Sequence, residues 1–77
     1  MEKVPSEIMI SVTYLPTGAT YYSLPVPVTL EQYVLTIEGL RQPAWLSIDR
    51  TEERKMYFSG EVLKQCVIEV EVTKFVG

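Results

Sequence analysis

The 77-residue sequence contains no histidine and no asparagine, and Cys66 is its only cysteine. Without histidine, the most common general base and metal ligand is missing, and Ser-His and Cys-His catalytic pairs are excluded. A single cysteine excludes an intramolecular disulfide and a thiolate zinc cluster. Without asparagine there is no N-glycosylation acceptor. We therefore expect a protein that is not an enzyme, with no catalytic residues and no cofactor.

Charge and hydropathy exclude further classes of function. Seven basic residues against ten acidic ones give a formal net charge of -3, so bulk charge does not favour nucleic acid or anionic lipid as partners. No apolar run approaches the roughly 20 residues of a membrane span, and the first residues lack the pattern of a signal peptide. We expect a cytosolic or virion-associated protein if the chain is complete, and an extracellular one if it is a module of a longer protein.

The length and composition are those of one small globular domain. A chain of 8.8 kDa fits a single unit over residues 1–77, and 47% hydrophobic residues argue against disorder. A chain this short buries only roughly 60% of the surface that its unfolded form exposes. The core must therefore be small.

The first part of the chain reads as a β-hairpin followed by an edge segment. Residues 7–15 (EIMISVTYL) alternate between two faces, which predicts a half-buried strand. Proline and glycine in residues 16–19 predict a turn, and residues 20–24 would return as the second strand. The prolines of residues 24–28 (LPVPV) lack the N–H that a central strand needs, so this segment is expected at a sheet edge or as an extended connector.

Residues 29–39 support two interpretations. Leu30, Tyr33, Val34 and Ile37 would share one face of a helix, and Thr29 with Gln32 would form a capping box. The same stretch is rich in β-branched and aromatic residues that also alternate with period two. We favour a strand here and keep the helix as the alternative.

The last part of the chain predicts three further strands. Residues 43–49 (PAWLSID) would place Trp45 and Leu46 side by side as a buried anchor. The charged run 50–55 (RTEERK) reads as the solvated tip of a hairpin that continues into 56–59. Residues 65–75 alternate most clearly. Six or seven short strands in total predict an all-β sandwich or small barrel.

The C-terminal half also resembles a known family. The matching positions are Pro43, Trp45, Leu46, Asp49, Phe58, Ser59 and Gly60. This pattern is similar to that of the cadherin-like or putative-Ig modules of the dystroglycan type. The resemblance implies a small immunoglobulin-like β-sandwich that serves as a spacer, adhesion module or appendage and not as an enzyme.

Two groups of residues are candidates for binding. Asp49, Glu52 and Glu53 could offer three oxygen ligands to calcium, although a solvated loop is the simpler interpretation and no metal is expected. Cys66 falls on the apolar face of the last strand and is expected to be a small buried hydrophobe. Aromatic side chains on outer faces could form a patch for a protein partner; the candidates are Tyr21, Tyr22, Tyr57 and Phe75.

We therefore expect a non-enzymatic interaction or spacer module that presents a surface or an edge strand to a protein partner. An edge strand could also pair two copies as a homodimer. If residues 30–38 are helical, the order becomes ββαβββ, a β-grasp-like α+β adaptor or a small inhibitory or accessory protein. A carbohydrate-binding module is a lesser alternative, because it requires Trp45 to be exposed.

Overall fold

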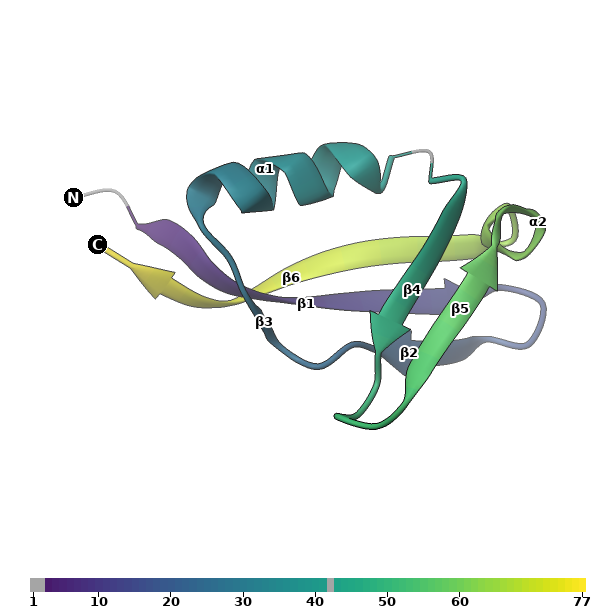
Figure 1. The fold of residues 1–77 in the computed structure, drawn as a ribbon. Helices are drawn as coiled ribbons and strands as arrows, with labels where there is room; N and C mark the ends of the chain where they lie inside the picture. The colour runs from purple at the N-terminus through teal and green to yellow at the C-terminus, as the bar shows by residue number, and fades with distance from the viewer. Residues whose placement is uncertain (1–2, 42) are drawn as a thin grey trace.

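The computed structural model describes residues 3–41 and 43–77 and shows a small β-rich domain built on two sheets (Figure 1). About half of the residues lie in strands, which confirms the β-rich class expected from the sequence. The elements of the described residues are β1 (Val4–Tyr14), β2 (Ala19–Tyr22), β3 (Val26–Pro27), α1 (Leu30–Gly39), β4 (Trp45–Asp49), β5 (Lys55–Ser59), α2 (Gly60–Leu63) and β6 (Cys66–Val76).

Strand β1 is the centre of the larger sheet. One of its edges pairs with β2 and β3, and the other pairs with β6 along almost its whole length. Strands β4 and β5 form a separate hairpin that crosses in front of this sheet (Figure 1). All of these pairings are antiparallel. The Leu24 N–H donates to the Asp49 carbonyl at 2.7 Å and ties the two sheets together.

The predicted N-terminal hairpin and edge segment are confirmed. Gly18 has φ of 75°, the left-handed conformation that glycine adopts without strain, and its N–H donates to the Tyr14 carbonyl at 2.8 Å. Strand β3 lies at the sheet edge, where Pro27 faces Glu7 across the pair. The N–H that Pro27 lacks costs no hydrogen bond there, because no further strand pairs with the outer edge of β3 in the described residues.

The strand that we favoured for residues 29–39 is wrong, and the helical alternative is confirmed. The Gln32 N–H donates to the Thr29 hydroxyl at 3.1 Å, and the Thr29 N–H donates to the Gln32 side-chain oxygen at 3.0 Å. This capping box satisfies N–H groups that a helix start otherwise leaves open. It outweighs the β propensity of Tyr33, Val34 and Ile37, which is the weaker guide because it depends on having a neighbouring strand to pack against.

The core lies between the β4–β5 hairpin and the larger sheet. Its buried members are Val12, Leu46, Ile48, Phe58 and Leu63. Successive side chains of a strand point to opposite faces, so with Leu46 and Ile48 directed inward, Trp45 must point outward. The expected burial of Trp45 is therefore wrong: 57% of this residue is exposed.

Helix α2 is a single turn that sequence patterns did not indicate. The Ser59 hydroxyl accepts from the Val62 N–H at 3.4 Å and caps its start, and Leu63 turns into the core. Gly60 is the first residue of this turn and lies against the backbone of Ala44. A Cβ atom on Gly60 would lie 2.7 Å from the Ala44 carbonyl oxygen. The glycine is needed because the two chain segments approach so closely.

We expect Gly60→Ala to lower the free energy of unfolding by about 1–3 kcal/mol, because two segments of backbone must separate to admit the methyl group. Gly39→Ala is the matched control, since a Cβ at Gly39 meets nothing within 4 Å, and it should be neutral or stabilise α1 by up to about 1 kcal/mol. Urea unfolding of both variants measures the difference. A Gly60→Ala protein as stable as wild type would contradict this account.

Candidate binding face on the hairpin of strands 4 and 5

The outward face of the β4–β5 hairpin carries a compact set of aromatic and polar side chains. Period-two alternation turns the first, third and fifth residues of each strand away from the core. The cross-strand register aligns them as the pairs Trp45 with Ser59, Ser47 with Tyr57, and Asp49 with Lys55. We refer to these six residues as the hairpin face.

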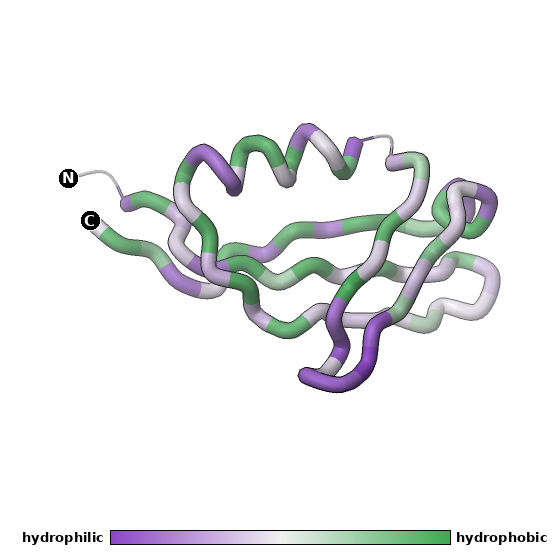
Figure 2. The backbone as a smooth tube through the Cα atoms, viewed as in Figure 1, coloured by the Kyte–Doolittle hydropathy of each residue, from purple (hydrophilic) through white to green (hydrophobic). Residues whose placement is uncertain are grey.

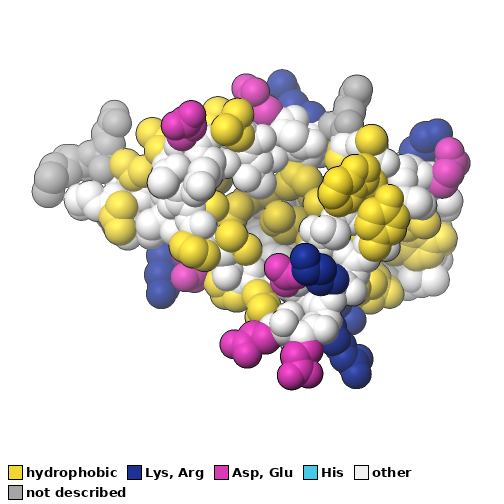
Figure 3. Space-filling model, in the orientation of Figure 1, with side chains coloured by type: hydrophobic (Ala, Val, Ile, Leu, Met, Phe, Trp, Pro, Cys, Tyr) yellow, Lys and Arg dark blue, Asp and Glu magenta, His cyan; other side chains and the backbone are white. Residues whose placement is uncertain are grey.

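Two aromatic rings dominate the upper part of the hairpin face. The Trp45 and Tyr57 rings are offset-stacked, with centroids 5.8 Å apart and planes 24° apart, and Tyr57 is 67% exposed. Figure 3 shows hydrophobic side chains gathered over this part of the hairpin. On the opposite side of the same strands, Leu46 and Phe58 face each other and are buried. The core therefore holds the aromatic pair on a fixed support.

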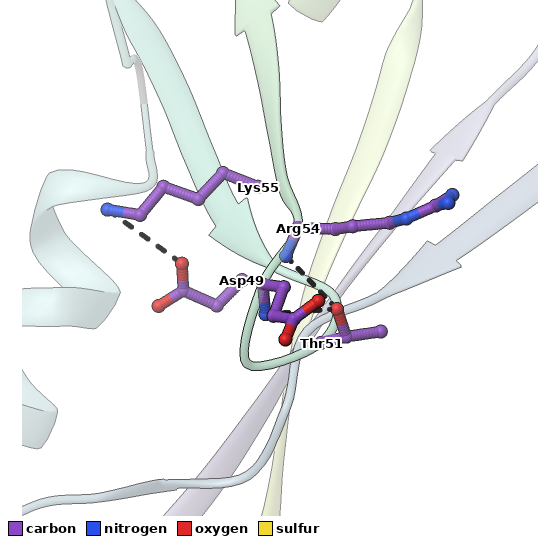
Figure 4. Close-up of polar contacts among 5 residues, drawn as sticks. Asp49, Thr51, Arg54 and Lys55 are labelled. Carbon is purple, nitrogen blue, oxygen red and sulfur yellow. Dashed lines mark hydrogen bonds and ion pairs between the residues drawn. The ribbon is translucent and has the colours of Figure 1, made fainter.

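The lower part of the hairpin face is polar and leads into a hydrophilic tip (Figure 2). The Lys55 ammonium lies 3.8 Å from an Asp49 carboxylate oxygen, and both side chains are well exposed (Figure 4). An exposed ion pair of this kind contributes little to stability, so both groups remain able to contact a ligand. The turn is closed by Thr51, whose hydroxyl accepts from the Arg54 N–H at 3.0 Å.

The three carboxylates proposed for calcium do not form a cluster. No group of three or more His, Cys, Asp or Glu side chains converges within residues 3–41 and 43–77. Asp49 lies on the hairpin face beside Lys55, whereas Glu52 and Glu53 border a shallow surface depression with Leu24. The compact turn separates them, because Asp49 belongs to the strand and the two glutamates to the tip.

The aromatic candidates from the sequence lie in different places. Tyr57 is on the hairpin face, but Tyr21 packs beside Phe58, with ring centroids 6.1 Å apart, and against the core. The Arg50 guanidinium covers the Tyr21 ring at 5.3 Å from its centroid. Tyr22 and Phe75 are exposed on β2 and β6. Sequence reasoning missed Trp45, although the alternation of buried Leu46 and Ile48 was the signal that places it outward.

Cys66 is half-buried against the core, as a small apolar residue would be. Its thiol donates to the Val62 carbonyl at 3.2 Å. Burial raises the pKa of the Cys66 thiol, because it disfavours the charged thiolate. Because the thiolate is the nucleophile, this setting disfavours reactivity.

A wider depression of about 650 Å³ lies beside α2 and offers little chemistry. Its charged lining groups are Arg41, Glu61 and Lys64, and the last two form an exposed ion pair at 3.3 Å. No histidine, cysteine or aspartate lies among the described residues that line it. The hairpin face is the better candidate for a binding site.

No protein-family model, curated protein or solved structure matches the chain. The resemblance to immunoglobulin-like modules therefore stays a prediction that depends on the residues quoted for it. In the part of the chain that the structure describes, no helix is long and apolar enough to cross a membrane.

We expect the fluorescence of Trp45, the only tryptophan, to behave as that of a solvated indole. Emission should be red-shifted, and acrylamide should quench it nearly as strongly as free tryptophan, because more than half of the residue is exposed. Removing the stacked ring with Tyr57→Ser should increase quenching further, whereas Leu15→Ser, an exposed apolar position in the turn between β1 and β2, should leave it unchanged. Blue-shifted, poorly quenched emission would contradict the outward orientation of Trp45.

Proposed function

We propose that the chain is a non-enzymatic binding module and that the hairpin face contacts a protein partner. The observation that carries this proposal is the exposed stack of Trp45 and Tyr57 above a buried pair, Leu46 and Phe58. Tryptophan and tyrosine are enriched among the residues that supply most of the binding energy at protein interfaces. A rigid support lowers the entropy that binding costs, because the rings are already ordered.

The surroundings of the stack support the same proposal. Protein interfaces combine an apolar centre with a polar rim. Here the rim consists of Ser47 and Ser59 beside the rings, and of Asp49 with Lys55 toward the tip. The charges of Asp49 and Lys55 are opposite, so this face does not depend on a partner of one sign.

The test is affinity capture of the partner by the immobilised protein, from a lysate of the cells in which the protein is naturally made. Trp45→Ser should weaken capture of the partner about thirtyfold, since it removes a residue at the centre of the contact. Leu15→Ser is the matched control: it also removes an exposed apolar side chain, but in the turn that follows β1 and far from the hairpin in sequence. Equal capture by wild type and Trp45→Ser would overturn the protein-binding proposal.

The exposure of Trp45 also favours a second candidate, carbohydrate binding, which burial of this residue would have excluded. The C–H face of a sugar ring stacks on aromatic rings, and sugar hydroxyl groups both donate and accept hydrogen bonds. The Trp45 and Tyr57 rings could supply the first contact. Ser47, Asp49 and Lys55 carry hydroxyl, carboxylate and ammonium groups suited to the second.

Intrinsic fluorescence tests the carbohydrate candidate, because Trp45 is both the proposed sugar contact and the only tryptophan of the sequence. Titration with oligosaccharides of several linkage types should shift the emission to the blue as a sugar covers the indole. Tyr57→Ser should weaken this binding about tenfold, and Leu15→Ser should not. If no sugar changes the emission and none binds on a glycan array, this candidate is wrong.

A further inference from the structure

The two edges of the larger sheet are built differently. On one side of β1, strand β2 has four residues and β3 has two, one of which is Pro27. Short strands and prolines are common devices that keep a sheet edge from pairing with other chains. On the other side, β6 runs for 11 residues without a proline or a glycine. No second strand pairs with it in the described part of the chain, so its outer edge is free (Figure 1).

The pairing of β1 determines which main-chain groups lie on this free edge. The Ile10 carbonyl accepts from the Ser23 N–H at 2.8 Å, and the Ile10 N–H donates to the Ser23 hydroxyl at 2.8 Å. Both groups of Ile10 therefore point away from β6. Val70 lies opposite Ile10, and in an antiparallel ladder its own N–H and C=O must then point away from β1. By the same alternation, the main-chain groups of Ile68 and Val72 also face the free edge.

No other described element satisfies these groups. Outside the sheet ladders and helices, no main-chain hydrogen bond of residues 3–41 and 43–77 reaches Ile68, Val70 or Val72. Helix α1, which lies above β6 in Figure 1, packs against β1, and no hydrogen bond joins it to β6. An exposed edge of this kind can bind an extended peptide as an additional strand.

The core face of β6 favours apolar residues in such a strand. Ile68 lies opposite Val12, and Val72 lies opposite Ile8. The two β1 residues are buried, whereas the two β6 residues are only half-buried, because the sheet ends beside them. Apolar side chains at the equivalent positions of an added strand would extend the core and remove further apolar surface from water.

The opposite face of β6 is acidic. Glu69 and Glu71 are exposed there, and neither forms an ion pair within the described residues. Their neighbours on β1, Ser11 and Met9, carry no charge. In an added antiparallel strand, the residues opposite the two glutamates would occupy the positions where side chains of paired strands come closest. Lysine or arginine at these positions would be attracted, and acidic residues would be repelled.

The same charges disfavour a second copy of β6 as the added strand. Because the outward-facing main-chain groups belong to even-numbered residues, even residues of one copy must pair with even residues of the other. Registers centred on Glu69, Val70 or Glu71 then place glutamate opposite glutamate, which is destabilising.

We propose that the outer edge of β6 binds an extended segment of a protein partner in which apolar residues alternate with lysine or arginine. The segment adds to the sheet as an antiparallel strand. Its apolar residues lie beside Ile68, Val70 and Val72, and its basic residues lie beside Glu69 and Glu71. The hairpin face takes no part in this contact, so the proposal does not depend on the function proposed for that face.

The test uses a fluorescent peptide in which valine alternates with lysine, capped at both ends to remove its terminal charges. Fluorescence anisotropy should show saturable binding below about 1 mM. Replacing every lysine by glutamate should weaken binding at least about tenfold, because attraction becomes repulsion. N-methylation of the valines leaves the charges unchanged but should abolish binding, because the valine N–H groups would bond to β6. Hydrogen exchange of the Ile68, Val70 and Val72 amides, followed by NMR, should slow at least about tenfold in the complex.

Variants of the protein test the two acidic residues. The double variant Glu69→Gln with Glu71→Gln should weaken binding of the lysine peptide about tenfold. Glu52→Gln with Glu53→Gln is the matched control, because it removes two exposed carboxylates from the hairpin tip and should change nothing. Trp45→Ser should also leave peptide binding unchanged, which separates this contact from the hairpin face. Circular dichroism verifies that each variant is folded.

Three results would each contradict the proposal. The first is no binding of the lysine peptide up to about 1 mM. The second is equal affinity for the lysine and glutamate peptides, because the acidic face would then have no role. The third is equal affinity for the N-methylated peptide, because the contact would then not be strand addition.

Discussion

The packing of the β4–β5 hairpin across β1 is the contact on which the rest of this structure depends. Val12, on strand β1 of the larger sheet, is completely buried in one core cluster with the hairpin residues Leu46, Ile48 and Phe58. An isolated two-stranded hairpin is at best marginally stable in water, so β4 and β5 persist because their inner face is covered. The same packing decides the function proposed here, since it fixes which side chains of the hairpin remain outside.

How far sequence patterns predict this fold depends on how many forces agree at each segment. The β1–β2 hairpin and β6 were predicted because alternation, turn residues and β propensity all favour the same structure. In α1 the cap favours a helix, whereas the β-branched residues favour a strand. The apolar residues of this segment also fit both the period-two spacing of a strand and the spacing of one helix face. Helix α2 is too short to show any period. Its only local signals were Ser59 and Gly60, and the close approach of Gly60 to Ala44 is a contact between distant residues that the sequence does not reveal.

The candidate site, too, could be predicted from the sequence only in part. Tyr57 was predicted as a surface aromatic, but Trp45 was assigned to the core because a large ring beside Leu46 suggested an anchor. Adjacent strand residues cannot share a face, so applying alternation strictly would have placed Trp45 outside. The separation of Asp49 from Glu52 and Glu53 could not be predicted, because it depends on turn hydrogen bonds such as that from Arg54 to Thr51.

The pairing of β1 with β6 has a consequence for how the chain folds. These strands lie at opposite ends of the sequence, with Val4 beside Val76 and Tyr14 beside Cys66. Forming their ladder closes a long loop, and contacts of such high sequence separation slow folding. During synthesis the central sheet stays incomplete until β6 has left the ribosome. Until then, the edge of β1 that pairs with β6 has no neighbouring strand.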